Sequence, residues 1–129
     1  MHYQHSRHAV FLINYHFIFV PKYRKKILVG CIKQRLTDFI QTYPEEKDLQ
    51  VLALEIMPDQ VHLFLSTPPS ISPSQIVHGI KGRTSRLLRQ EFPFLKRHKA
   101  FWSRSYFVGS SGNVSSENIK KYIEESQHL

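Results

Sequence analysis

Several features that would narrow the class of this protein are scarce or absent in its sequence. The 129 residues include a single cysteine, Cys31, so no disulfide can form within the chain and a cytoplasmic location is expected. The apolar run at residues 9–13 is followed at once by Asn14, far short of the roughly 20 apolar residues of a membrane-spanning helix. The sequence shows no signal peptide, internal repeat or low-complexity linker. We therefore expect one domain over residues 1–129, with no membrane partner.

Acidic residues are also few. Ten Asp and Glu face 18 Lys and Arg, which gives a formal net charge of +8 and a pI near 9.8. With 41% hydrophobic and 12% aromatic residues, the chain is too apolar for a disordered basic tail and long enough for a real core. A small basic domain of this kind most often binds a polyanion, above all nucleic acid.

Two groups of basic residues are candidates for contact with a nucleic acid. One is a cluster at residues 22–26, where Tyr23 is embedded among cations in a composition that suits phosphates and stacked bases. The other is the charged side of a predicted helix. The candidate DNA-binding residues are Lys22, Arg24, Lys25, Lys81, Arg83, Arg86 and Arg89. Each group also has an alternative interpretation without a ligand: the cluster at residues 22–26 could be a solvated turn, and the charged helix side could serve only solubility.

The first third of the chain predicts a strand and a helix. Residues 11–20 are rich in aromatic and branched side chains, which favours a strand that Pro21 ends. Over residues 29–43 apolar side chains recur at helical spacing, and Pro44 is predicted to stop this helix.

The middle of the chain predicts a hairpin. Residues 49–57 and 61–67 have the composition of strands, and Pro58-Asp59 between them forms a turn. In the first of these strands strict alternation places Leu52, Leu54 and Ile56 on one face.

The last part predicts two helices around a strand. Ser72 and Pro73 are a capping hydroxyl and a first-turn proline, so a helix begins there and runs to about Glu91. Residues 101–108 are aromatic enough for a fourth strand and its approach, and a helix over about 115–129 carries Tyr122 on its inner side. The order predicts an α+β fold, namely a ferredoxin-like or RRM-like split βαβ domain. It has a four-stranded, mainly antiparallel sheet and an extra C-terminal helix that carries the tyrosine.

Two polar residues on the third predicted strand are the candidate site. Gln60 and His62 are two positions apart, so their side chains point to the same face. Neutral imidazole is a common metal ligand, and an amide oxygen can coordinate a hard cation such as Mg²⁺. The simpler alternative is a hydrogen-bonded structural histidine. Tyr122 likewise either anchors the last helix or acts as a nucleophile, in which case a divalent cation would polarise the phosphodiester that it attacks.

Four segments in a fixed order carry a resemblance to a known family. They are residues 15–24 (YHFIFVPKYR), 57–64 (MPDQVHLF), 102–107 (WSRSYF) and 113–125, which ends in IKKYIEE. Together they span nearly the whole chain. In these segments the chain resembles the single-tyrosine transposases of the HUH endonuclease superfamily, the small enzymes of bacterial and archaeal insertion sequences.

The resemblance implies a specific activity. Such a transposase binds single-stranded DNA beside hairpins at the element's ends, then cleaves and rejoins it through a covalent 5′-phosphotyrosine intermediate. The implied cofactor is Mg²⁺ or Mn²⁺, with no nucleotide cofactor, and the implied assembly is a homodimer whose terminal helix can complete the partner's active site. By the same resemblance Tyr122 is the nucleophile, His62 is the retained HUH histidine, and the basic face at residues 81–89 is a hairpin-binding surface.

The chain departs from the family pattern at two positions. Gln60 stands where the motif has its first histidine, and Ser126 stands four residues after the tyrosine, where many members have glutamine. On a regular helix Gln127 lies about 140° from Tyr122 around the axis, whereas Glu125 lies about 60° away. Gln127 is our first choice of a third metal ligand by residue type, which requires a π-bulge or an early helix end, and Glu125 is the alternative.

The sequence leaves other functions open. Because Gln60 replaces a histidine, the chain could be a catalytically weakened DNA-hairpin-binding descendant of such a transposase. An RNA-binding module of similar sheet topology is a further alternative, although the chain has no aromatic-rich signature of that type.

Overall fold

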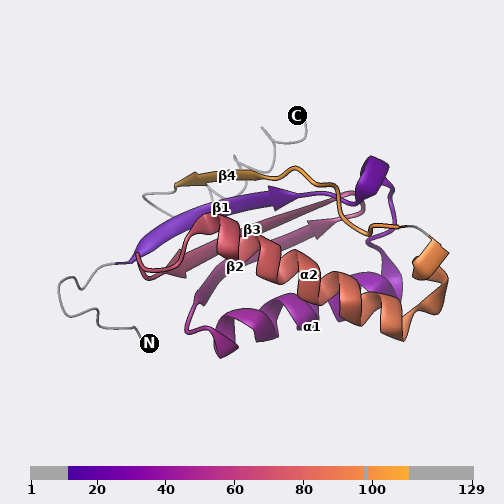
Figure 1. Ribbon diagram of the computed structural model, residues 1–129, viewed down its shortest axis with the longest axis horizontal. Coiled ribbons are helices and arrows are strands. Elements are labelled where there is room, and N and C mark those ends of the chain that lie inside the picture. The colour runs from indigo at the N-terminus through magenta and orange to yellow at the C-terminus, as the bar shows by residue number, and fades with distance from the viewer. Residues whose placement is uncertain (1–11, 98, 111–129) are drawn as a thin grey trace.

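Four strands and two long helices form the part of the chain that the computed structural model describes, residues 12–97 and 99–110 (Figure 1). In chain order the elements are β1 (Ile13–Phe19), η1 (Lys22–Arg24), α1 (Gly30–Glu46), β2 (Gln50–Met57), β3 (Gln60–Thr67), α2 (Pro73–Glu91), η2 (Pro93–Arg97) and β4 (Phe107–Ser110). The predicted C-terminal helix lies outside the described residues. No helix in the described ranges is long and apolar enough to cross a membrane.

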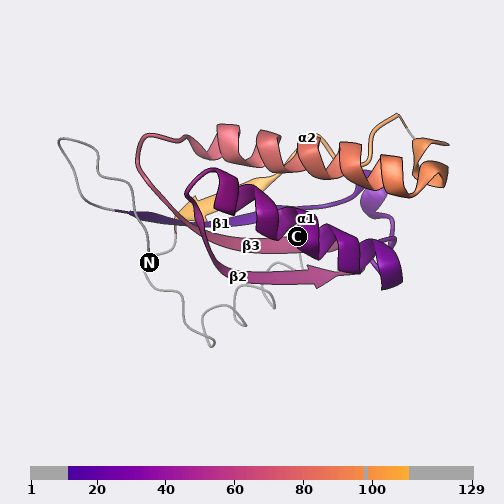
Figure 2. The ribbon, with the colours of Figure 1, turned by 90° about the horizontal axis from the view of Figure 1, so that it is seen from below.

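The sheet has the predicted split βαβ topology. Its strand order is β2-β3-β1-β4, and each neighbouring pair is antiparallel. Since β3 lies between β1 and β2, the unit β1-α1-β2 is split by a strand that comes later in the chain. The helices pack on one face of this sheet (Figure 2).

Alternation along β1 decides which side chains meet the helices. Phe17 and Phe19 belong to the hydrophobic core, together with Leu63 and Leu65 of β3. His16 and Ile18 therefore point to the opposite face of the sheet. Every residue of β3 is buried, so polar side chains on that opposite face are also removed from water.

Helix α2 begins at the predicted cap. The Ser72 hydroxyl accepts a hydrogen bond from the Gln75 backbone N–H, and the Gln75 side chain accepts one from the Ser72 N–H. This capping box satisfies two backbone donors that the first turn of a helix leaves without partners.

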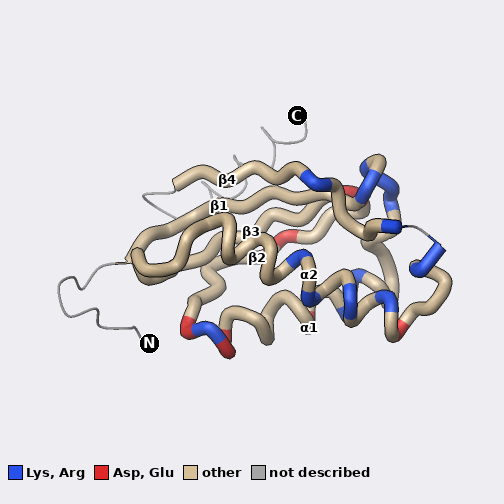
Figure 3. The backbone as a smooth tube through the Cα atoms, viewed as in Figure 1, with Lys and Arg blue, Asp and Glu red and all other residues tan. Residues whose placement is uncertain are grey.

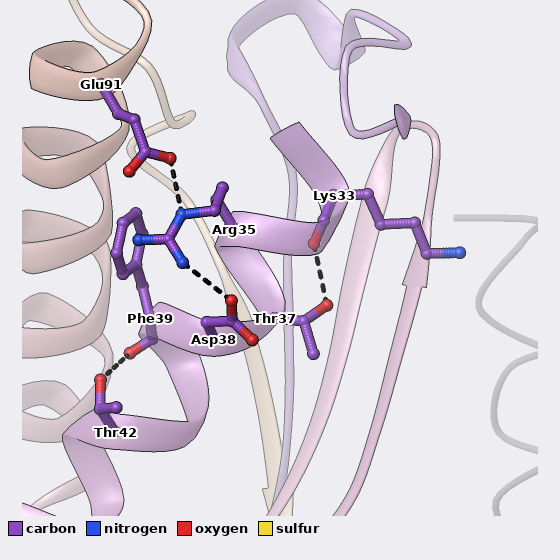
Figure 4. A network of polar contacts seen from close by, with 7 residues as sticks. All are labelled: Lys33, Arg35, Thr37, Asp38, Phe39, Thr42 and Glu91. Atoms are coloured by element: carbon purple, nitrogen blue, oxygen red, sulfur yellow. Dashed lines mark hydrogen bonds and ion pairs between the residues drawn. The ribbon is translucent and has the colours of Figure 1, made fainter. Parts of the chain in front are cut away.

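Helices α1 and α2 approach closely through a glycine and are tied by surface ion pairs. A Cβ atom on Gly79 would overlap the ring and hydroxyl of Tyr43. Arg35 of α1 donates to Glu91 of α2 at 2.6 Å, and to Asp38 of its own helix at 2.9 Å (Figure 4). These ion pairs are exposed and contribute little individually, so the close contact at Gly79 is the more specific feature of this interface.

Two predicted boundaries and one predicted face are wrong. Helix α1 continues through Pro44 to Glu46, because proline lies in its last turn and its carbonyl accepts the N–H groups of Lys47 and Leu49. The register of β2 shifts between Val51 and Ala53, so strict alternation fails and Leu52 is exposed instead of sharing the face of Leu54 and Ile56. The fourth strand is Phe107–Ser110, later and shorter than residues 101–108.

Candidate active site

The Gln60–His62 pair on β3 forms as predicted. Both side chains lie on one face, and the Nε2 atom of His62 is 3.1 Å from the Oε1 atom of Gln60. His62 is completely buried and Gln60 is 4% exposed. The β2–β3 hairpin places Gln60 first in its strand, directly after the turn at residues 58–59.

A third polar side chain, His16 of β1, completes this cluster. Its Nε2 atom lies 3.1 Å from the Nδ1 atom of His62, and its ring stacks on Phe64 with centroids 4.1 Å apart. Sequence reasoning missed His16. Alternation with Phe17 and Phe19 put it on the face opposite the core, but only the register of β1 against β3 brings it to His62.

The contacts define the donors and acceptors in the cluster. An amide oxygen only accepts, so the Nε2 atom of His62 donates its proton to Gln60 Oε1. The Nδ1 atom of a neutral His62 then accepts from the Nε2 atom of His16. The three side chains thus form a continuous chain of hydrogen bonds that fixes the orientation of both imidazoles.

Burial keeps both imidazoles neutral. Desolvation lowers the pKa of His62 to about 4. Desolvation, together with the nearby His62, also lowers the pKa of His16 to about 4. At neutral pH both rings therefore retain a lone pair, which is the form that binds metal ions.

The donor atoms of Gln60 and His62 fit a small divalent cation. Two ligands at right angles, each about 2.1 Å from an ion, are roughly 3.0 Å apart. The Oε1 and Nε2 atoms are 3.1 Å apart. An ion at Nε2 requires the other tautomer of His62, in which the proton lies on Nδ1 and is donated to the Nε2 atom of His16. Within the described residues no group of three or more His, Cys, Asp or Glu side chains could hold a metal, so this pair would need further ligands. The predicted ligands Gln127 and Glu125, and the predicted nucleophile Tyr122, lie outside the described residues.

The basic turn after β1 lies beside this cluster. Arg24 forms an ion pair with Asp59 at 3.0 Å, and Asp59 immediately precedes Gln60. The Lys22 ammonium lies 5.6 Å from the centre of the Tyr23 ring. Arg24 and Lys25 are exposed, as a phosphate-binding role requires, and Lys22 is half-buried.

The four basic residues of α2 separate into two groups. Lys81 is buried, and its ammonium donates to the backbone carbonyls of Ser103 and Ser105, so its predicted place on the charged side is wrong. Arg83 is bound to Glu46 of α1 at 2.6 Å. Both cations are bound by the protein itself, whereas Arg86 and Arg89 line an open groove and are therefore the better candidates on this helix.

Arg86 and Arg89 line an open groove that continues onto η2. The lining residues are Gly82, Ser85, Arg86, Arg89, Gln90 and Lys96. Figure 3 shows Lys and Arg concentrated at this end of the molecule, where β1 and α2 both end, whereas acidic residues cluster near the end of α1. The basic turn and the groove therefore belong to one basic end.

These features place the chain in a class of small α+β domains. Their split βαβ sheet carries the helices on one face and a buried imidazole–amide cluster, the candidate active site, on the other. Within that class the chain belongs to the IS200-like transposase family, whose model matches residues 9–126. Two curated relatives are transposases. The ISDra2 transposase TnpA of Deinococcus radiodurans is 34% identical over 126 residues, covering 95% of this chain and 89% of that protein. The IS200 transposase of Salmonella typhimurium is 31% identical, covering 93% and 83%.

Solved structures show the same fold. A crystal structure of a Deinococcus radiodurans R1 protein assigned as a transposase has a TM-score of 0.77 and 32% identity, covering 95% of this chain and 97% of that one. A REP-associated tyrosine transposase bound to a REP hairpin has a TM-score of 0.64, covering 98% of this chain and 74% of that one, and at 15% identity it supports the fold alone. The family and the split βαβ fold predicted from the sequence are thus confirmed, whereas the predicted C-terminal helix lies outside the described residues.

Proposed function

We propose that this transposase cleaves and rejoins single-stranded DNA at the ends of an insertion sequence. The observation that carries the proposal is the buried Gln60–His62 pair, whose oxygen and nitrogen donors are 3.1 Å apart at the basic end of the sheet. Such a pair suits Mg²⁺ or Mn²⁺, and Gln127, or alternatively Glu125, would add a ligand. A bound divalent cation there supplies charge stabilisation at the phosphate.

In this proposal Tyr122 is the nucleophile. Its hydroxyl oxygen forms a bond to phosphorus as the bond to the 3′-oxygen breaks, and its proton ends on that oxygen. The products are a 5′-phosphotyrosine link and a free 3′-hydroxyl, which can later reverse the reaction. The roles of Gln60 and His62 are to hold the cation, and that of His16 is to hold His62 in place.

The DNA substrate is a hairpin with a single-stranded flank. Three observations support this choice: the net charge of +8, the groove lined by Arg86, Arg89 and Lys96, and the similar fold of a transposase bound to a REP hairpin. The family resemblance further supports a homodimer.

A covalent trapping assay tests the proposal. Hairpin-bearing single strands from the native element ends are labelled at the 3′ end, so that the labelled fragment stays on the protein after cleavage. With Mg²⁺ or Mn²⁺ we expect a denaturation-resistant adduct that Tyr122→Phe abolishes. The matched control is Tyr15→Phe, which removes a hydroxyl on the helix side of β1 and should preserve the adduct. Absence of an adduct across divalent metals and several native ends would exclude the active transposase.

The second candidate is a catalytically weakened hairpin-binding descendant. The observation that favours it is that an amide, a weaker ligand than imidazole for softer metals, occupies the first position of the metal pair. It predicts hairpin binding that needs no metal and that Tyr122→Phe leaves unchanged. In the trapping assay Gln60→His would then create an adduct where the natural chain gives none, whereas strong activity of the natural chain would exclude this candidate.

A further inference from the structure

The turn after β1 holds an aromatic ring in water. Tyr23 is 80% exposed, and it lies within η1, the short turn of residues 22–24. Its φ is 63° and that of Arg24 is 50°, so two successive residues with a Cβ adopt the left-handed region. That region is strained for residues with a large side chain, and strain of this kind is concentrated at functional sites.

The surroundings hold the turn in this conformation. The Arg24 N–H donates to the Pro21 carbonyl at 2.8 Å, and the Lys22 N–H donates to the Phe101 carbonyl at 2.9 Å. The ion pair between Arg24 and Asp59 ties the turn to the hairpin that begins β3. An ordinary solvated turn needs neither a strained backbone nor these hydrogen bonds and this ion pair. The fold therefore holds the Tyr23 ring in its exposed position.

The environment of the ring has the chemistry of a nucleobase site. A small, largely apolar pocket lies beside it, lined in part by Ile27, Leu95 and Phe101. Lys22 lies over the Tyr23 ring, and the exposed Lys25 follows in the chain. An aromatic face surrounded by cations binds a base by stacking and its phosphate by charge.

We propose that Tyr23 is the stacking platform for an unpaired base in the single-stranded flank that leads to the Gln60–His62 pair. This inference rests on the proposed function and adds to it the residue that holds the flank. The Arg24–Asp59 ion pair gives the reason for the position, because it fixes the platform next to the residue that precedes Gln60.

Fluorescence of a modified DNA tests the proposal. The probe is a DNA hairpin whose single-stranded flank carries 2-aminopurine at one position at a time, because stacking quenches this base. We expect quenching at one flank position with the natural protein and none with Tyr23→Asn, together with about tenfold weaker binding. Asparagine tolerates the left-handed region, so this variant removes the ring and keeps the backbone.

Two further variants separate stacking from other roles. Tyr23→Trp keeps an aromatic face and should keep both the quenching and the affinity. Leu52→Ser removes an exposed apolar side chain from β2, near the end of that strand distant from the turn, and should behave as the natural protein. Melting temperatures of all variants, measured without DNA, should agree, because the ring makes little contact with the core.

The outcomes are distinguishable. If the natural protein fails to bind the flanked hairpin at all, the proposed function and this inference fall together. If it binds, and Tyr23→Asn binds and quenches equally well, only the stacking role is overturned. Equal loss in Tyr23→Asn and Tyr23→Trp would also overturn it, because any aromatic face should serve.

Discussion

The buried contact between His16 and His62 makes the stability of this fold sensitive to acid. In the folded chain burial lowers the pKa of each imidazole to about 4. In the unfolded chain each has a pKa near 6.5, so between these values the unfolded state binds more protons than the folded state. The free energy of unfolding must therefore fall as the pH falls from about 6.5 towards 4.

We predict that the free energy of unfolding falls by about 2 kcal/mol per histidine between pH 8 and pH 5. Each pH unit below 6.5 costs about 1.4 kcal/mol, and pH 5 lies about 1.5 units below it. Urea unfolding at the two pH values, with a chelator present, measures this difference. In His16→Asn the difference should shrink by about half, because one of the two groups is gone. Comparing two pH values within one variant cancels any general destabilisation by the substitution.

The exposed His78 provides the control for this measurement. It lies on α2 away from the cluster, and His78→Asn should keep the full difference between the two pH values. If His16→Asn shows the same difference as the natural chain, the folded and unfolded states protonate His16 equally, and the hydrogen-bond chain described here is wrong.

Sequence reasoning found two of the three residues of this cluster for a clear physical reason. Gln60 and His62 lie on one strand, where a period of two fixes their common face. His16 lies on another strand, and its contact with His62 depends on the pairing of Ile18 with His62 across the sheet. The register between two strands that are distant in sequence depends on how they pair in the fold, and the periodicity of either strand alone does not reveal it.

Among the elements, the contact of α1 with α2 depends on one glycine. A methyl group at Gly79 would overlap the Tyr43 ring, whereas a methyl group at Gly82, one turn further along α2, meets nothing within 4 Å. The two positions therefore form a matched pair within the same helix.

We predict that Gly79→Ala lowers the free energy of unfolding by about 1–3 kcal/mol, the usual cost of overpacking. Gly82→Ala should raise it by up to about 1 kcal/mol, because alanine favours a helix more than glycine does. Denaturant unfolding of both variants measures this. Adding Tyr43→Leu to Gly79→Ala should recover part of the loss. Equal effects of the two alanines would show that α1 and α2 are not in close contact at this position.

The prediction of elements failed where hydrogen bonds that the residue pattern does not reveal decide the local structure. Pro44 was expected to end α1, but the last turn of a helix accommodates it since the following N–H groups bind its carbonyl. Leu52 was assigned to a face by alternation, which the shift in register between Val51 and Ala53 breaks. Helix α2 was predicted with correct bounds because its apolar residues are strongly periodic and its capping residues lie within one short stretch of sequence.

Across the whole molecule, the topology followed from element order, but the distribution of charge did not follow from the helix pattern. The sequence placed Lys81, Arg83, Arg86 and Arg89 on one surface. The fold instead buries Lys81 against the approach to β4 and pairs Arg83 with Glu46. The basic surface is built from α2, η2 and the turn after β1, three segments that only the folded chain brings to one end (Figure 3).

This basic end predicts a strong dependence of hairpin binding on salt. Each phosphate contact to a DNA duplex contributes about 0.9 to the slope of log affinity against log salt concentration, because binding releases condensed counterions. Arg86 and Lys96 line the same groove, so Arg86→Gln with Lys96→Gln should reduce the slope by about 1.8. The stem of the hairpin alone, without a single-stranded flank, is the probe.

Lys47 supplies the control for the salt dependence, since it lies among acidic residues just after α1. Lys47→Gln should leave the slope unchanged within error, although it also lowers the net charge. Titrations at several salt concentrations therefore distinguish a localised phosphate-binding end from a general attraction by total charge. If Lys47→Gln reduces the slope as much per charge removed as Arg86→Gln with Lys96→Gln does, the attraction is general. The groove would then no longer belong to the proposed DNA-binding surface.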